Sequence, residues 1–268
     1  MPRDLSVEIA SHRDLGGGNH LLEVEAAPLA RETAPGQFFM IGFPGADTLL
    51  RRPFSVCGLP GTFDGSSRSA VHVLYKVVGR GTEHLASRKP GSPLSILGPL
   101  GRGFDLELGA GTEALLVAGG IGSAPFPALA AALGARGIRC TLLYGARSAS
   151  DLPLLDWFRA RAPEVIVTTE DGSAGTRGLV TDPLRERLAR GGNVRILACG
   201  PNPMLREVAA IAREASVPCE VSLEARMACG FGVCLGCVVP TRRGEGGETA
   251  YERVCVEGPV MPAEKLAW

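Results

Sequence analysis

The chain has 268 residues, and its 28 basic and 28 acidic side chains leave no formal net charge. This balance argues against a nucleic-acid-binding protein, which usually carries an excess of basic residues. We recognise no charge-rich tail, no signal peptide and no apolar run of about 18 residues, so we expect a cytoplasmic protein with no membrane-spanning segment.

Short β-rich segments fill the first hundred residues. Clusters of Gly, Pro, Asn and Asp separate them, as in a sandwich or a small barrel. One helix is predicted at residues 81–88, with Thr82 as its N-cap. The strands are predicted at residues 6–12, 20–26, 37–43, 52–59, 70–78 and 92–100.

Strands and helices alternate from residue 113 onward, which predicts βαβ units and a parallel sheet. The run at 113–120 is continuously apolar, as in a strand that is buried on both faces. From about residue 225 the pattern changes to a short strand at 237–240, a polar turn at 242–248 and a segment at 251–260, typical of a small appended domain. Further strands are predicted at 138–146, 164–170, 194–200 and 218–224, and helices at 127–137, 152–162, 179–190 and 202–214.

Four of the eight cysteines crowd the end of the chain. Cys229, Cys234 and Cys237 have the spacing C-x4-C-x2-C, and Cys255 follows at a distance. In a reducing compartment such a group indicates a metal site rather than disulfides. Plant-type ferredoxins bind [2Fe–2S] clusters with this spacing, whereas structural zinc sites usually pair one C-x2-C with a second pair of ligands. We therefore predict a [2Fe–2S] site, with zinc as the alternative.

The remaining titratable groups carry weaker signals. The other four cysteines stand alone among apolar or glycine residues, where we expect small buried side chains. The four histidines have no metal-like grouping, and we interpret them as ordinary strand or surface residues. These residues are Cys57, Cys140, Cys199 and Cys219, and His12, His20, His72 and His84.

Two glycine-bearing loops each join a predicted strand to a predicted helix. They are VAGGIGSAP at 117–125 and CGPNPM at 199–204. Both would lie at the carboxyl ends of parallel strands, where α/β sheets bind ligands, and the first could bind a pyrophosphate at a helix N-terminus. A tight turn explains a single such loop equally well. In the first segment, Arg52, Phe54 and Ser55 offer a phosphate ligand, a ring and a hydroxyl, although ordinary strand surface has the same composition.

The motifs R-x-[FY]-S, G-G-x-G-x-x-P and C-G-P-x-P-M occur here in that order. Together they resemble the ferredoxin reductase-like flavoproteins. With the added MACGFGVCLGC segment, the whole chain resembles the electron-transfer subunits of bacterial dihydroorotate dehydrogenase B. The resemblance implies an α+β multidomain protein: an antiparallel FAD-binding β-barrel at 1–104, an α/β NAD domain with a parallel sheet at 105–223, and a small [2Fe–2S] domain at 224–268.

The resemblance also implies roles for individual residues. Lys76 stands where the family pattern has arginine, which keeps the charge but loses the planar fork. We assign no catalytic residue, although Cys199 would lie near the nicotinamide. The implied FAD contacts are Arg52, Pro53, Phe54, Ser55, Leu74, Tyr75, Lys76, Gly81 and Thr82. The implied NAD contacts are Gly119, Gly120, Gly122, Pro125, Cys199, Gly200, Pro201 and Met204, and the cluster ligands are Cys229, Cys234, Cys237 and Cys255.

In this family a partner subunit carries FMN and oxidises dihydroorotate in pyrimidine (UMP) biosynthesis. Electrons then pass through [2Fe–2S] and FAD to NAD⁺, and the resemblance implies a heterotetramer with two copies of each subunit. NAD rather than NADP is expected on family grounds, although Arg147 and Ser148 stand where a 2′-phosphate would bind. Subunits of NAD(P)H:ferredoxin oxidoreductases, sulfide dehydrogenases and soluble hydrogenases share these parts and stay open as alternatives. A zinc-stabilised binding module is the alternative from another class.

Overall fold

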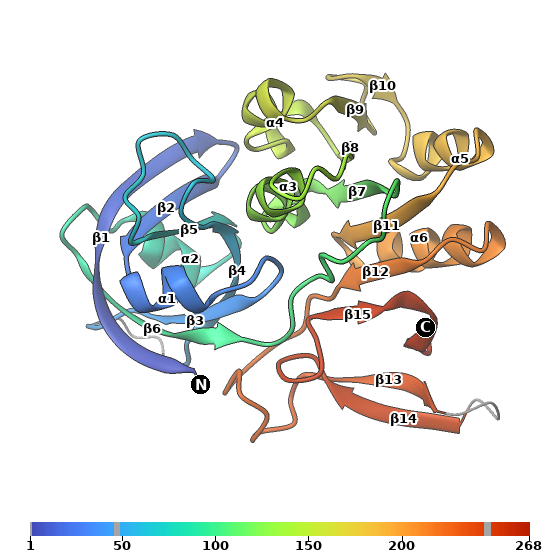
Figure 1. Ribbon diagram of the computed structural model, residues 1–268. Coiled ribbons are helices and arrows are strands. Elements are labelled where there is room, and N and C mark those ends of the chain that lie inside the picture. The colour runs from blue at the N-terminus through green and yellow to red at the C-terminus, as the bar shows by residue number, and fades with distance from the viewer. Residues whose placement is uncertain (1, 46–48, 244–247) are drawn as a thin grey trace.

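The computed structural model describes residues 2–45, 49–243 and 248–268. Within them the chain forms a closed β-barrel, a large sheet with helices on both faces, and a C-terminal hairpin (Figure 1). The predicted α+β architecture, with an antiparallel barrel followed by a parallel sheet, is confirmed.

The barrel closes in the order β1-β2-β5-β4-β3-β6, and every neighbouring pair is antiparallel. Alternate side chains point into it and pack as one apolar core, which includes Leu22, Phe39, Val56 and Val73. Burying these side chains on the inner face is the main favourable term that holds a barrel of this kind closed. The strands are β1 (Arg3–Gly16), β2 (Asn19–Glu25), β3 (Phe38–Gly42), β4 (Arg52–Gly58), β5 (Ala70–Lys76) and β6 (Pro93–Leu100).

Two short helices accompany the barrel, and each corrects the sequence-based prediction. Helix α1 (Ala27–Glu32) was not predicted, because six residues are too few to reveal a helical period. Helix α2 (Arg80–Ala86) has Gly79 at its N-cap, so the assignment of Thr82 as the N-cap was wrong. Thr82 is the third helical residue; its hydroxyl accepts a hydrogen bond from the Val78 N–H (2.8 Å) and donates one to the Gly79 carbonyl (2.9 Å). The hydroxyl of a residue in the first helical turn can thus form the hydrogen bonds that backbone groups at the helix N-terminus would otherwise lack.

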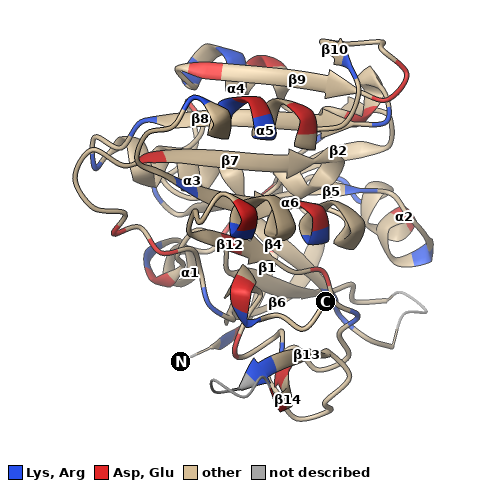
Figure 2. Ribbon diagram, turned by 90° about the vertical axis from the view of Figure 1, so that its right-hand side faces the viewer, with Lys and Arg blue, Asp and Glu red and all other residues tan. Residues whose placement is uncertain are grey.

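The large sheet has the order β10-β9-β8-β7-β11-β12-β15. All neighbours are parallel except the last pair, in which β15 runs antiparallel to β12. Figure 2 shows β7, β8 and β9 lying side by side in this sheet. Its strands are β7 (Glu113–Gly119), β8 (Cys140–Ala146), β9 (Glu164–Thr169), β10 (Thr176–Arg177), β11 (Val194–Cys199), β12 (Cys219–Ser222) and β15 (Val260–Pro262).

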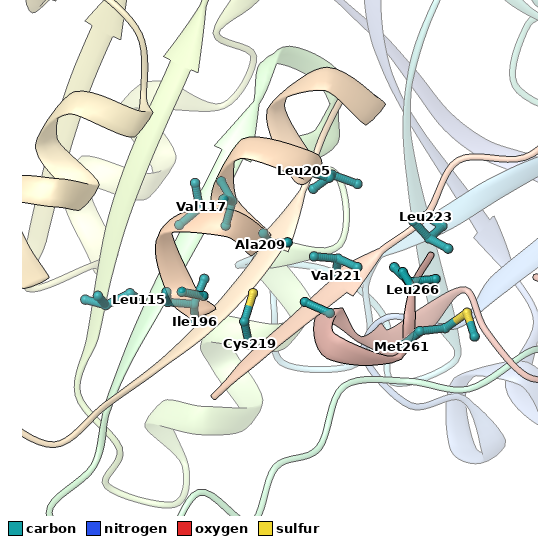
Figure 3. Close-up of a cluster of buried hydrophobic side chains, with 14 of the residues drawn as sticks. Leu115, Val117, Ile196, Leu205, Ala209, Cys219, Val221, Leu223, Met261 and Leu266 are labelled. Atoms are coloured by element: carbon teal, nitrogen blue, oxygen red, sulfur yellow. The ribbon is translucent and has the colours of Figure 1, made fainter. Parts of the chain in front are cut away.

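Helices cover both faces of this sheet because alternate strand residues are apolar on both sides. Leu116 and Tyr144 face α3 (Phe126–Gly134) and α4 (Leu155–Arg161). Leu115 and Ile196 face α5 (Thr181–Ala189) and α6 (Asn202–Glu214), and Figure 3 shows this second cluster beneath α6. No helix in the described residues is long and apolar enough to span a membrane.

The C-terminal segment is attached to both larger parts of the molecule. Strands β13 (Val238–Arg243) and β14 (Glu248–Arg253) form an antiparallel hairpin. The predicted polar turn at 242–248 falls largely on residues 244–247, which lie outside the described residues. After the hairpin, β15 joins the large sheet, and the short helix η3 (Ala263–Lys265) returns to the hairpin through an ion pair of 2.7 Å between Lys265 and Glu252.

The barrel and the large sheet meet in a small apolar cluster. Leu21, Cys57 and Leu74 of the barrel pack there with Ala124, which follows β7 and the short helix η1 (Gly120–Ser123). Two ion pairs also cross this boundary, Lys76 with Asp151 and Asp64 with Arg161. These contacts fix how the barrel is oriented on the sheet.

Candidate functional site

A pocket of about 680 Å³ lies where the barrel, the large sheet and the C-terminal segment meet. All nine residues that the sequence assigns to FAD line this pocket. They come from β4, from β5 and from the start of α2, so the fold gathers residues 52–55, 74–76 and 81–82 in one place. That these residues contact FAD stays a prediction. The other lining residues are Phe38, Val78, Gly79, Arg80, Ile121, Ala124, Leu223, Glu224, Ala225, Met227 and Pro259.

Arg52 lies at the meeting point of two of these segments. A Cβ atom at Gly81 would lie 3.1 Å from Arg52 Nε, so a larger residue there would press on the guanidinium. Arg52 Nη1 donates to the Leu50 carbonyl at 2.5 Å. No carboxylate of the described residues forms an ion pair with Arg52, so its charge can serve an anion that enters the pocket.

Lys76 has a different environment from Arg52. Its ammonium group forms an ion pair with Asp151, in the short helix η2 (Ala149–Asp151) that follows β8. Lys76 therefore joins the pocket wall to the large sheet, and Asp151 offsets part of its charge. Lys76 therefore has less uncompensated charge to offer an anion in the pocket than Arg52 has.

The two glycine-bearing loops follow neighbouring parallel strands, β7 and β11. They touch directly: a Cβ atom at Gly122 would lie 2.5 Å from the Cys199 carbonyl oxygen, and one at Gly119 would lie 2.6 Å from Met204 Sδ. Glycine at these positions thus allows the two loops to pack directly on each other. Together the loops make one surface at the carboxyl edge of the sheet, where ligands bind in folds of this class.

Cys199 is buried at the end of β11. Burial, with a smaller effect from Glu224, raises the pKa of its thiol to about 12. The thiol is therefore protonated at neutral pH and is a poor nucleophile.

Glu224 was missed by the sequence analysis. It follows the last parallel strand, β12, keeps an exposed surface and lines the pocket. Partial burial of the carboxyl group raises its pKa above the usual 4.5. Its place after the carboxyl end of a parallel strand was the available signal, since such positions line ligand sites.

The four C-terminal cysteines form two pairs. The Cys234 N–H points at Cys229 Sγ (3.4 Å), and the side chains of Cys237 and Cys255 interact with each other. Burial raises the pKa of Cys255 to about 12, and the nearby Cys237 adds to this effect. Burial also raises the pKa of the Cys229 thiol. Hydrogen bonds from the N–H groups of Cys234 and its neighbours outweigh this effect and lower the pKa to about 6.

This arrangement fits a two-iron cluster better than a single ion. A [2Fe–2S] cluster takes four thiolates, two on each iron, and backbone N–H groups directed at sulfur tune such clusters. Within the part of the chain that the structure describes, no three His, Cys, Asp or Glu side chains lie close enough together to hold one metal ion. A tetrahedral zinc site would need four ligands around one point.

The cysteine loop has an apolar outer surface. Phe231, Val233 and Leu235 alternate with the cysteines and are 52%, 72% and 59% exposed. On its inner side the loop packs on the barrel, because Cys237 and Cys255 belong to the same buried cluster as Phe38 and Met40. Met227, two residues before Cys229, lines the pocket, so the cysteine loop adjoins it.

A second pocket, of about 790 Å³, lies at the opposite edge of the sheet, where β7, β8 and β11 begin. It contains none of the predicted site residues. Its charged residues are already paired, Arg187 with Glu113 and Arg136 with Glu107. We therefore place the functional site at the first pocket and the cysteine loop.

Comparison with known proteins agrees with this placement. Residues 224–267 match the model of the iron–sulfur cluster binding domain of dihydroorotate dehydrogenase B, and residues 116–210 match the oxidoreductase NAD-binding domain. The electron transfer subunit of dihydroorotate dehydrogenase B (NAD(+)) from Desulforamulus reducens is 36% identical over 93% of this chain and 92% of its own length. The corresponding subunit of Bacillus caldolyticus is 40% identical over 96% of each chain.

The chain belongs to this family of electron-transfer subunits. The family resemblance inferred from the sequence motifs is thereby confirmed. Among solved structures, an NADH-dependent reduced ferredoxin-NADP oxidoreductase aligns with a TM-score of 0.83 and 30% identity, over 98% of this chain and 90% of the other. A ferredoxin NADP⁺ reductase from Neisseria gonorrhoeae, with a TM-score of 0.63 and 16% identity over 79% of this chain and 91% of its own, shares the fold.

Proposed function

We propose that the chain is the electron-transfer subunit of an NAD-dependent dihydroorotate dehydrogenase. In this role it carries electrons from the FMN of a catalytic partner subunit through [2Fe–2S] and FAD to NAD⁺, during pyrimidine biosynthesis. The observation that carries the proposal is that the cysteine loop adjoins the pocket, which is lined by Ala225 and Met227 just before Cys229. A cluster on this loop and a flavin in the pocket would therefore lie close to each other.

Each part of the chain has a limited task in this function. Arg52 would bind a phosphate of FAD, and Phe54 with Tyr75 would support the flavin as an aromatic wall. The other pocket residues proposed for FAD are Pro53, Ser55, Leu74, Lys76, Gly81 and Thr82. The loops at 119–125 and 199–204 would hold NAD beside it. FAD supplies the exchange between hydride and single-electron chemistry when it is bound, so the chain itself needs no general base.

The four cysteines would hold the cluster, Cys229 with Cys234 and Cys237 with Cys255. Phe231, Val233 and Leu235 surround this site on the outside. We propose that these three residues, called here the cluster rim, dock on the FMN-bearing subunit. Apolar side chains that surround the point of electron exchange would exclude water from it when the two subunits meet.

The same proposal includes domain limits at 104/105 and 223/224. It also includes a heterotetramer with two copies of each subunit, located in the cytoplasm. Eight free cysteines support a reducing compartment. The absence of net charge supports a protein partner rather than nucleic acid.

A direct experiment combines this chain with an FMN-containing dihydroorotate dehydrogenase subunit. The chain alone should oxidise NADH with an artificial electron acceptor and should leave dihydroorotate unchanged. The mixture should form NADH from dihydroorotate and NAD⁺. Dihydroorotate oxidation by the isolated chain, or none by the mixture, would contradict the proposal.

The ferredoxin-linked alternative is supported by one observation, the likeness to the NADH-dependent reduced ferredoxin-NADP oxidoreductase over 98% of the chain. The two functions differ in the partner. Reduction of ferredoxin by NADH in the presence of the chain and a second oxidoreductase subunit, without any dihydroorotate-dependent activity, would favour the alternative. The visible absorption spectrum of the purified chain tests the zinc module, because a zinc protein without flavin or iron–sulfur cluster is colourless.

A further inference from the structure

Two histidines that the sequence left without a role flank Tyr75 in the barrel wall. His20 of β2 is the direct cross-strand partner of Tyr75 on β5. Their rings stack at 5.2 Å with an angle of 15° between the planes. His12 of β1 completes the group, with its ring centre 5.3 Å from His20 and 6.0 Å from Tyr75. His12 and His20 do lie in strands, as the sequence analysis expected, and strand pairing brings them together beside Tyr75.

The hydrogen bonds of His12 determine which of its atoms carries the proton. Nδ1 lies 2.8 Å from the Arg88 carbonyl oxygen, and Nε2 lies 2.8 Å from the Tyr75 hydroxyl. A carbonyl oxygen only accepts, so Nδ1 must be the donor. In the neutral ring Nε2 is then an acceptor, and the Tyr75 hydroxyl donates to it.

These two bonds reach two walls of the pocket. Tyr75 lines the pocket, is 2% exposed and packs edge-on against Phe54 at 5.8 Å. Arg88 follows α2, whose first residues, Gly81 and Thr82, line the pocket as well. His12 itself does not line the pocket, so it can act there only through its two partners.

We propose that His12 is a positioning residue for FAD. By accepting a hydrogen bond from the Tyr75 hydroxyl, it fixes the aromatic pair of Tyr75 and Phe54, and by its bond to the Arg88 carbonyl it fixes α2 against the same wall. This inference rests on the proposed function, in which the pocket holds FAD.

The test measures FAD affinity of the flavin-free chain by fluorescence titration, with visible circular dichroism of the bound flavin as a second readout. His12→Leu should weaken FAD binding roughly 5- to 15-fold, as expected for the loss of one buried hydrogen bond. His12→Gln should restore most of the affinity, because its amide can donate to Arg88 and accept from Tyr75. Glu8→Leu, on the exposed side of the same strand, is the matched control and should bind FAD like wild type.

Two further comparisons separate positioning from general stability. Tyr75→Phe should weaken binding, and adding His12→Leu to it should cause a smaller loss than His12→Leu causes in wild type, because only the Arg88 bond is then still to be lost.

If His12→Leu and Tyr75→Phe both bind FAD with the affinity and flavin dichroism of wild type, the inference is wrong, while the FAD site itself stands. If His12→Leu does not fold, Tyr75→Phe and His12→Gln decide the question. A wild-type chain that does not bind FAD would overturn the proposed function instead.

Discussion

Gly230 of the cysteine loop lies directly against Met40 of the barrel. A Cβ atom at Gly230 would lie 2.4 Å from Met40 Cγ and 3.4 Å from Leu100 Cδ1. Met40 is fully buried on β3, one residue from Phe39 and two from Phe38 in the pocket wall. This contact therefore sets how close the proposed cluster comes to the proposed flavin.

Gly230→Ala should destabilise the chain and lower its iron content. The residue has a φ of +81°, which costs roughly 1–2 kcal/mol for alanine, and the new methyl group would overpack Met40 at a further cost of about 1–3 kcal/mol. Gly91→Ala is the matched control, because Gly91 has a φ of +83° and nothing within 4 Å of its Cβ position. Chemical denaturation and iron analysis of both variants measure the difference. Equal losses in the two variants would show that the Met40 contact is unimportant.

Cys234→Ser should remove the iron–sulfur absorption and leave FAD bound. Cys234 is exposed at the tip of the loop, and none of the four C-terminal cysteines lines the pocket. Serine is a poor ligand for the soft site that thiolates provide. Cys140→Ser, at the start of β8 and far along the chain from the loop, should keep its iron. Full iron content in Cys234→Ser would refute the assignment of this ligand.

Val233→Asp and Leu235→Asp, both in the cluster rim, should weaken association with the FMN-bearing subunit. Each places a charge in what we propose is the desolvated centre of an interface, where substitutions commonly cost 2 kcal/mol or more, roughly a 30-fold loss of affinity. NADH oxidation with an artificial acceptor should be unchanged, since it does not need the partner. Leu179→Asp, 56% exposed before α5, is the control. Subunit binding by calorimetry decides: equal affinity in all three variants would place the interface elsewhere.

Features that depend on neighbouring residues were predictable from the sequence, and features that depend on tertiary pairing were not. The spacing of Cys229, Cys234 and Cys237 is local, so it identified the cluster loop directly. The role of His12 depends on strands β1 and β5, which place it beside Tyr75, 63 residues away in the chain. Strand β15 is three residues long and is an edge strand only because β12 offers it a partner.

Glu224 is the sole acidic residue that lines the pocket within the described part of the chain. Sequence reasoning gave it no role because its neighbours form no recognised motif. In the fold it stands between Cys199, whose pKa it helps to raise, and the segment that leads to Cys229. A carboxylate at this place would repel the phosphates of FAD, so we expect it to lie toward the other end of the bound cofactor.

Glu224→Gln should stabilise the flavin-free chain at neutral pH and have little effect in acid. Burial disfavours the charged carboxylate and raises its pKa in the folded chain above the usual 4.5. A group with a raised pKa binds its proton more tightly when folded, so the folded state loses stability as the pH rises from 4.5 through the folded pKa, and the loss is constant above that value. Glutamine has no proton to lose, so its advantage over glutamate should grow along the same interval. Glu186→Gln, at an exposed position of α5, should show no such trend. Thermal unfolding of the three flavin-free proteins across this range measures the effect, and an advantage of Glu224→Gln that shrinks as the pH rises would contradict the prediction.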